Sequence, residues 1–194
     1  MRKIILGLSV LAVMMFTSGC STMHMGWTAV TSQHKLDDGA MPAYDAMFTK
    51  VAKYGDPARA MMKEYPVAED VTGDDVKESI AALAEDYNMR QTGYVKMFTK
   101  KDAKPNEVKE ARIWSLCSLH IAKIFLNHSR YFGGFMPCRI MYVQYGNGKA
   151  YLITMDLNLA IHGGYPLPPE MGKLAAKVKT AMEEIPAKAA QGDF

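Results

Sequence analysis

Two adjoining apolar strands separated by a glycine-rich turn limit the folds available to this chain. The expected strands run from Cys138 to Tyr145 and from Lys149 to Leu157, and Gly146-Asn147-Gly148 lies between them. Glycine and asparagine adopt the positive φ of a tight turn, so these residues predict a β-hairpin. Apolar side chains stand at both odd and even positions, as in strands whose sheet is covered on both faces. Helices can cover one face, and a second subunit can cover the other.

Periodicities on either side of the hairpin predict an α+β domain over residues 71–186. Its expected order is αββαββα, with a small sheet of about four strands covered by helices. A helical extension over residues 41–66, broken at Gly55-Asp56-Pro57, precedes this domain, and residues 187–194 form a tail. The other expected elements are a helix over 72–87, strands over 93–99 and 111–117, a helix over 118–131 and a helix over 168–185.

The first 20 residues resemble the signal of a bacterial lipoprotein. Arg2 and Lys3 precede an apolar run from Ile4 to Phe16, and Thr17-Ser18-Gly19-Cys20 closes the segment. A basic start, a short apolar run and small residues before a cleavage point are typical of a secretory signal. A buried first helix and a transmembrane anchor are the alternatives, but a bilayer span needs about 20 apolar residues. The resemblance implies that residues 1–19 are removed and that the sulfur of Cys20 carries a diacylglycerol.

Residues 20–40 are small and polar, and they predict a flexible tether between the lipid and the domain. Ser21 follows the cysteine. In the lipoproteins that the signal resembles, an aspartate at this position holds the protein at the inner membrane. We therefore expect a periplasm-facing protein, with the outer membrane favoured in a Gram-negative host.

The charge balance argues against a nucleic-acid partner. The chain has 23 Lys and Arg residues and 20 Asp and Glu residues, and two of the basic residues lie in the signal. The remaining chain is nearly neutral and has no block of basic residues, so it lacks the electrostatic footprint of a nucleic-acid-binding protein.

The middle of the chain resembles a bacterial family. Cys117 ends an expected strand, a helix follows, and Met136-Pro137-Cys138-Arg139-Ile140 opens the next strand, before the hairpin and Met155-Asp156-Leu157. From about Val71 to Glu184, these features resemble the family catalogued as domain of unknown function 302. The resemblance implies a compact α+β domain that is often paired as a dimer, and no established activity or catalytic set. The residues that carry its signature are Cys117, Pro137, Cys138 and Arg139.

Cys117 and Cys138 are expected to stay apart. A helix of about 14 residues between them runs back about 20 Å, so parallel strands would place the two thiols at opposite ends of the sheet. A disulfide needs Cα atoms within about 7 Å. We predict that they do not pair within one chain and that both are buried free thiols. The alternatives are an intrachain disulfide and a ligand or redox role.

His162 is the sharpest candidate for a binding site. It follows the second hairpin strand and precedes Gly163-Gly164, where backbone can approach a ligand closely. It is either a solvated turn residue or a ligand to haem or a metal, with Met155 and His128 as further candidate ligands. The absence of Cys-x-x-Cys-His from the sequence excludes covalent c-type haem, which leaves haem b or copper.

No nucleophile, base and orienting acid stand out in the sequence, so an enzyme is the least favoured class. The leading hypothesis is a non-enzymatic binding or electron-transfer module of the cell envelope, with haem b or a metal as ligand. The alternative is a structural or partner-binding lipoprotein without a cofactor. The two-faced strands favour a homodimer in either case.

Overall fold

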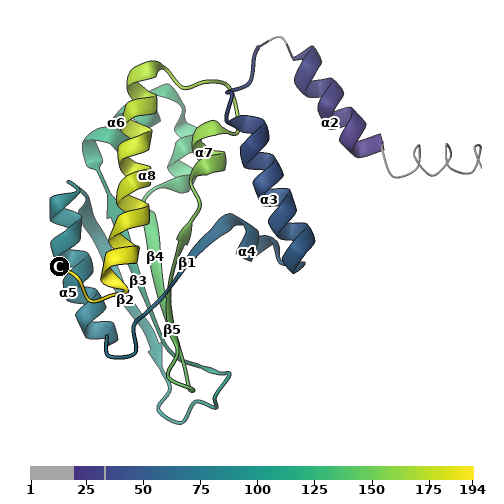
Figure 1. Ribbon diagram of the computed structural model, residues 1–194. Coiled ribbons are helices and arrows are strands. Elements are labelled where there is room, and N and C mark those ends of the chain that lie inside the picture. Colours follow the sequence, from purple (N-terminus) through teal and green to yellow (C-terminus); the bar gives the residue numbers. More distant parts are fainter. Residues whose placement is uncertain (1–19, 33) are drawn as a thin grey trace, which may run out of the picture.

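The computed structural model describes residues 20–32 and 34–194, so the signal predicted for residues 1–19 lies outside the described part. One antiparallel sheet forms the centre of the domain, and helices lie over one face of the sheet and beside its edges (Figure 1). The predicted α+β class is confirmed, with five strands instead of about four. The elements are α2 (Cys20–Thr31), α3 (Ala40–Tyr54), α4 (Pro57–Met61), β1 (Met62–Pro66), α5 (Gly73–Asp86), β2 (Arg90–Thr99), β3 (Val108–Cys117), α6 (Leu119–His128), the 3-10 helix η1 (Arg130–Phe135), β4 (Cys138–Tyr145), β5 (Ala150–Met155), α7 (Asn158–His162) and α8 (Pro169–Ala189).

The strands lie in the order β1-β5-β4-β3-β2, and every neighbouring pair is antiparallel. The predicted hairpin connects β4 and β5, with Tyr142 opposite Leu152. Gly148 has a φ of 88° in its turn, a conformation that glycine adopts without strain. The Asn147 side chain accepts a hydrogen bond of 3.0 Å from the backbone of Lys149 and closes the turn.

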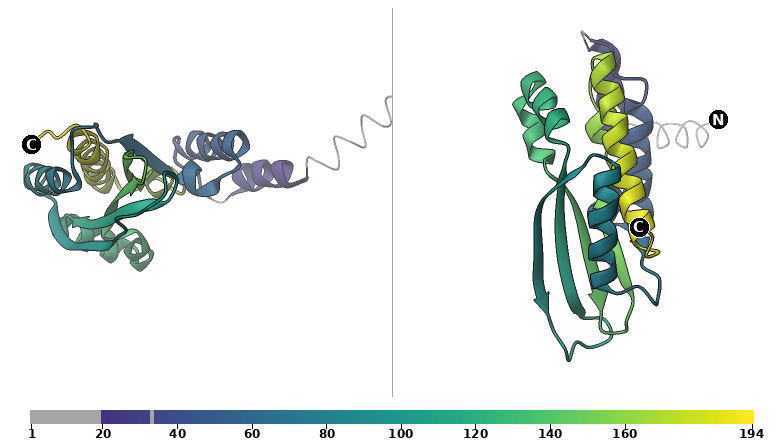
Figure 2. Two further views of the ribbon diagram at one scale, coloured as in Figure 1. Left: turned by 90° about the horizontal axis from the view of Figure 1, so that it is seen from below. Right: turned by 90° about the vertical axis from the view of Figure 1, so that its left-hand side faces the viewer.

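Helices α5 and α8 pack side by side on one face of the sheet (Figure 2). The predicted apolar stripe of α5 is confirmed, since Val76, Ile80 and Leu83 are all buried. Burial of apolar surface here supplies the main stabilisation of the domain. The largest completely buried side chains of this core are Trp114, Tyr142, Ile80, Leu116, Ile140, Leu152, Met182 and Ile185.

The opposite face of the sheet is also apolar, and helices border it: α3 and α4 share a hollow with residues of β4 and β5, and η1 shares another with residues of β3, β4 and β5. Strand alternation and register place a group of large apolar side chains on this surface, which we call the open face. Val95 and Phe98 on β2 are each about half exposed, at 54% and 48%. The residues of the open face are Val95, Phe98, Ile113, Met141, Val143, Tyr145, Tyr151 and Ile153.

The last part of the expected helical extension is a strand. The break at Gly55 and the start of a short helix at Pro57 agree with the prediction, and the Asp56 side chain accepts hydrogen bonds from the backbone of Ala58 and Arg59. From Met62, however, the chain pairs with β5. Helical spacing of apolar residues is a local signal, and here the unpaired edge of β5 overrides it.

Two other segments differ from expectation. The predicted tether contains helix α2, and the helix expected over 118–131 ends at His128 and continues as η1, which includes Gly133-Gly134. Helix α6 and η1 lie beyond the end of the sheet at which β3 finishes and β4 begins (Figure 2). Within residues 20–32 and 34–194, no helix combines the length and the apolarity needed to cross a membrane.

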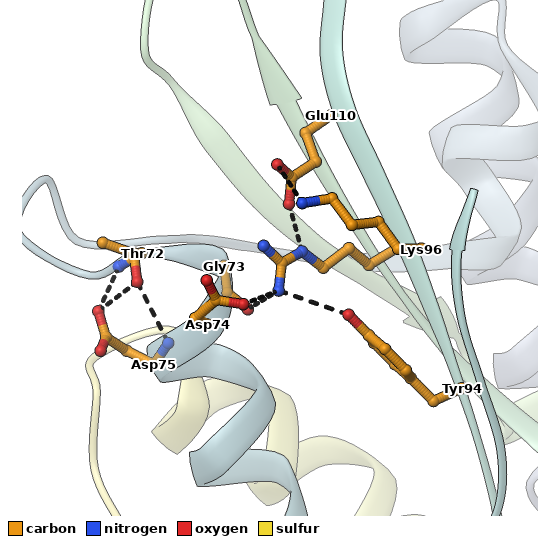
Figure 3. Close-up of polar contacts among 8 residues, drawn as sticks. Thr72, Gly73, Asp74, Asp75, Tyr94, Lys96 and Glu110 are labelled. Atoms are coloured by element: carbon orange, nitrogen blue, oxygen red, sulfur yellow. Dashed lines mark hydrogen bonds and ion pairs between the residues drawn. The ribbon is translucent and has the colours of Figure 1, made fainter. Parts of the chain in front are cut away.

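One buried arginine links the first turn of α5 to the sheet. Arg112 is 3% exposed, and its Nη1 donates hydrogen bonds to the carbonyl oxygen of Gly73 at 2.8 Å and to the carboxylate of Asp74 at 2.6 Å (Figure 3). Its Nε donates to Glu110. The hydrogen bond from Arg112 lowers the pKa of Asp74. A cation in the core needs such partners, because desolvation of an unpaired charge is costly.

The start of α5 is built around this guanidinium. Thr72 and Asp75 form a capping box, in which each side chain accepts a hydrogen bond from the other residue's backbone. Gly73 follows the cap, and a Cβ at this position would lie 2.9 Å from Cζ of Arg112. Glycine therefore allows the helix to begin directly against the guanidinium group.

We expect Arg112→Met to lower the free energy of unfolding by about 3 kcal/mol, because it leaves the mostly buried Glu110 carboxylate without its main partner. Lys100→Met is the matched control, since it removes an exposed ion pair with Glu107 and should cost less than about 1 kcal/mol. Urea unfolding followed by circular dichroism measures both. Equal effects of the two substitutions would contradict the importance of the buried cluster.

Candidate functional site

A cavity of about 510 Å³ lies between α3 and the chain segment that runs from the end of β5 into α7. This volume is in the range of pockets that hold small molecules and cofactors. Most of its wall is apolar, and its polar side chains are Lys50, Asp156, Asn158 and His162. The apolar lining consists of Pro42, Ala43, Ala46, Met47, Ala60, Met61, Met62, Phe135, Met155, Leu159 and Ala160.

Three contacts hold α3 over this cavity. The hydroxyl group of Tyr44 donates a hydrogen bond of 2.9 Å to the carbonyl oxygen of Gly163. The backbone N–H of Asp37 donates one of 2.9 Å to Gly164. At the other end of the cavity, Nζ of Lys50 lies 3.7 Å from a carboxylate oxygen of Asp156. The helix is therefore attached to both ends of the segment that carries His162.

The Asp37 carboxylate orients the ring of His162, the last residue of α7. The Nδ1 atom of His162 lies 2.9 Å from Oδ1 of Asp37, and the same oxygen accepts the N–H of Gly39 at 2.8 Å. The bond from Gly39, together with that from His162, lowers the pKa of Asp37. An ionised carboxylate beside Nδ1 favours the tautomer with its proton there. We assign the lone pair to Nε2, the arrangement in which a carboxylate-bound histidine binds a metal.

The packing of Gly39 against His162 leaves no room for a side chain. A Cβ on Gly39 would lie 2.9 Å from Cγ of His162. The segment before α3 therefore fixes the imidazole from two directions, by a hydrogen bond from one residue and by contact with another. A ring held in this way is preorganised for a ligand.

Methionine supplies the other soft donor atoms of the cavity. Met155 ends β5 and stands opposite Met62 in the register of β1, while Met47 belongs to α3 and Met61 ends α4. Imidazole and thioether groups bind haem iron and copper. In the described part of the chain, no group of three or more His, Cys, Asp or Glu residues could hold a metal ion. A metal in this cavity would therefore depend on methionine sulfur beside His162.

The cavity brings together two of the three predicted ligands. His162 and Met155 both line it, whereas His128 does not. Helical spacing predicts that His128 shares the apolar face of its helix with Ile121 and Phe125, but His128 is the last residue of α6 and its side chain is exposed. Its ring centroid lies 6.3 Å from that of Phe132.

The two cysteines lie closer together than the sequence suggested. β3 and β4 are antiparallel neighbours with Leu116 opposite Cys138, so the idea that the thiols lie at opposite ends of the sheet is wrong. Both thiols are free, and strand alternation directs Cys117 and Cys138 to opposite faces. Burial raises the pKa of Cys117, and burial with the nearby Cys117 raises that of Cys138 to about 11. Such thiols are protonated and unreactive at neutral pH.

The other signature residues lie near the border of the open face. Pro137 and Arg139 line a smaller hollow of about 200 Å³ together with Met141 and Ile153. Neither residue lines the cavity that contains His162. The hollow that contains the signature residues nevertheless adjoins the candidate site, because Met62, Phe135 and Met155 line both.

Sequence reasoning missed Asp37 and Met47 as residues of the site. Asp37 lies in the segment predicted to be a tether, and Met47 lies in α3, before the α+β domain. The turn-forming pair Asp38-Gly39 was a local signal for ordered backbone before α3. No sequence signal connects this segment to α7, because the connection forms only when α3 packs beside the sheet.

The family model described as "Domain of unknown function DUF302" matches residues 64–185, from within β1 to within α8. The cavity therefore combines residues of the matched region with α3 and α4, which precede it. A crystal structure of an uncharacterized conserved DUF302 protein from Bacillus stearothermophilus is similar, with a TM-score of 0.49 and 12% sequence identity. The similarity covers 65% of this chain and 95% of that chain. No curated protein matches the chain.

Proposed function

We propose that this chain, which belongs to the DUF302 family, is a non-enzymatic binding module of the cell envelope. In this proposal it holds haem b in the cavity beside His162. The observation that carries the proposal is the position of a carboxylate-oriented imidazole on the wall of a mainly apolar cavity of about 510 Å³. A haem pocket needs an apolar lining and an axial ligand of this kind.

The size and lining of the cavity favour haem over a bare copper ion. An ion needs donor atoms that converge within a few ångströms, whereas this cavity is lined mostly by carbon atoms. Lys50 adds a cation on the wall, and its 3.7 Å contact with Asp156 is long enough to be exchanged for a haem carboxylate. Copper bound by His162 and methionine sulfur is the second candidate.

Electron transfer is the role that suits these ligands best. His162 and Met155 offer an imidazole and a thioether, the types of side chain that hold the iron in cytochromes c. If both side chains held haem here, the group would supply electron-transfer chemistry. The protein would therefore carry an electron or store the cofactor rather than catalyse a reaction.

We expect haem b added to the purified chain to give a Soret band that His162→Ala abolishes or shifts. His128→Ala is the matched control and should leave the band unchanged, because His128 lies outside the cavity. Met155→Ala should alter the spectrum of the reduced form if its sulfur is the second ligand. Thermal melting checks that each variant is folded. A chain that stays colourless, or the same band in all variants, would contradict the proposal; metal analysis after copper titration tests the second candidate.

We also propose that the protein reaches its place as a lipoprotein. The support is the segment Thr17-Ser18-Gly19-Cys20 after a short apolar run. Acyl chains on Cys20 would hold the protein firmly, because each buried CH2 contributes about 0.8 kcal/mol. The domain would face the periplasm, and Ser21 favours the outer membrane in a Gram-negative host.

Cys20→Ala should release the protein from the membrane or leave it unprocessed, because the acceptor sulfur is lost. Fractionation at high salt and mass spectrometry of the N-terminus measure the two outcomes. Cys117→Ala is the control and should remain membrane-bound. Unchanged partition of Cys20→Ala would show that lipid on this residue is not the anchor.

The open face favours self-association, which is expected whether or not the domain binds a cofactor. Its centre is apolar and a second copy could cover it by sheet-on-sheet packing, with equivalent residues on both sides of a two-fold axis. Val95 and Phe98 extend this surface to the exposed edge strand. We propose that the protein is a homodimer through this face.

Light scattering at micromolar concentration should give the mass of a dimer, and Val95→Asp should give that of a monomer. The substitution places a charge within the proposed interface at a position that is already 54% exposed, so the fold should tolerate it. Tyr131→Asp, on η1, is the control and should leave the dimer intact. A monomeric wild-type protein would refute the interface.

A further inference from the structure

Three of the four larger apolar side chains described in α2 lie on the side turned away from the rest of the protein. Met23, Trp27 and Val30 recur at the spacing of one helical face and are 68%, 71% and 83% exposed. We call this set the outer face of α2. A helix that packs on a water-soluble domain has the opposite arrangement, with apolar residues turned toward the core.

The other side of α2 borders a groove shared with α3 and the segment after α7. Residues of this side lie about half a turn from the outer face, and several are polar. Ser32 lies 3.5 Å from the hydroxyl group of Tyr165 across the groove. The α2 residues that line the groove are His24, Met25, Thr28 and Ala29, and Ser32 follows the helix. This side of α2 therefore borders the domain, and the outer face is turned away from it.

The composition of α2 suits lipid better than a charged protein surface. From Cys20 to Thr31 the helix has no Asp, Glu, Lys or Arg residue. A tryptophan beside aliphatic side chains is typical of the membrane–water interface, where its ring is apolar and its N–H stays hydrated. The 12 residues extend about 18 Å, too short to cross a hydrocarbon core of about 30 Å.

The position of α2 in the chain identifies its partner. Cys20, the residue proposed to carry the lipid, is the first described residue of α2, so in a lipidated chain the helix would lie next to the bilayer surface. We infer that α2 lies in the plane of the membrane interface, with Met23, Trp27 and Val30 inserted among the lipids. This inference rests on the proposed lipoprotein anchor. In it, part of the segment predicted to be a flexible tether makes a second contact with the membrane.

Such a contact would fix how the domain stands on the membrane. Ser32, directly after α2, contacts Tyr165, and Asp37 connects the following segment to His162 and Gly164. A helix lying on lipid would therefore hold the cavity close to the bilayer, where an apolar cofactor partitions. A flexible spacer would leave this distance and orientation undefined.

The chain contains an internal probe for the experiment. Its two tryptophans are Trp27 and the completely buried Trp114, so a change of emission on contact with lipid reports Trp27. The acylated protein is placed in phosphatidylcholine vesicles, and the unacylated chain from Ser21 to Phe194 is mixed with an excess of the same vesicles. In both samples, the emission maximum of Trp27 should move to shorter wavelength. Brominated lipid should quench this emission, and acrylamide in the water phase should quench it less than it does without vesicles.

Substitutions on the two sides of α2 distinguish this contact from nonspecific adsorption of the protein to vesicles. Met23→Ser with Val30→Ser should reverse the shift and weaken vesicle binding of the unacylated chain at least about tenfold, because two apolar side chains no longer insert. Met25→Ser is the matched control, since Met25 is a 58% exposed methionine on the groove side, and it should leave both readings unchanged.

The outcomes distinguish the helix from the anchor. Trp27 emission that vesicles do not change in either protein overturns the inference, as does an equal effect of Met25→Ser. A shift that grows with protein concentration without lipid would mean that the outer face binds a second copy, which also overturns it. If mass spectrometry finds no lipid on Cys20 while the unacylated chain still shows the shift, the anchor proposal fails and the membrane contact of α2 stands.

Discussion

The pairing of β1 with β5 is the interaction on which the candidate site depends. Met62 stands opposite Met155, and the N–H of Asp156 donates a hydrogen bond of 2.9 Å to Met61. This ladder joins the segment before the family domain to the edge of its sheet. Helices α3 and α4 are thereby placed beside the strand that leads into α7. Without the pairing, the cavity would have only one wall.

The two apolar faces of the sheet have different surroundings. One face is buried under α5 and α8, and Arg112 adds a set of directional contacts that fixes where α5 begins. The open face keeps its apolar residues, which a second copy of the chain would cover in the proposed dimer. An antiparallel sheet can have one face away from the core, but that face is usually polar. The composition of this face is therefore an argument for a partner.

The N-terminal part of the protein combines three contacts of different chemistry. The proposed lipid on Cys20 would provide affinity for the membrane, the outer face of α2 would provide orientation, and Asp37 connects the segment to the ring of His162. A carboxylate that orients an imidazole would also link the proposed cofactor site to the segment before α3. Loss of haem and displacement of α3 would then be coupled, since both involve His162.

Local patterns in the sequence determined the elements that depend on neighbouring residues. The α+β class, the hairpin at Asn147, the cap and apolar stripe of α5, and the last helix all follow from turn chemistry and periodicity, and the structure contains them. Tertiary structure alone decided that Met62–Pro66 is a strand, that β3 and β4 are antiparallel, and that Asp37 meets His162. Each of these depends on a contact between distant residues. Helical spacing is visible in a short window of sequence, whereas an unpaired strand edge or a carboxylate 125 residues away is not.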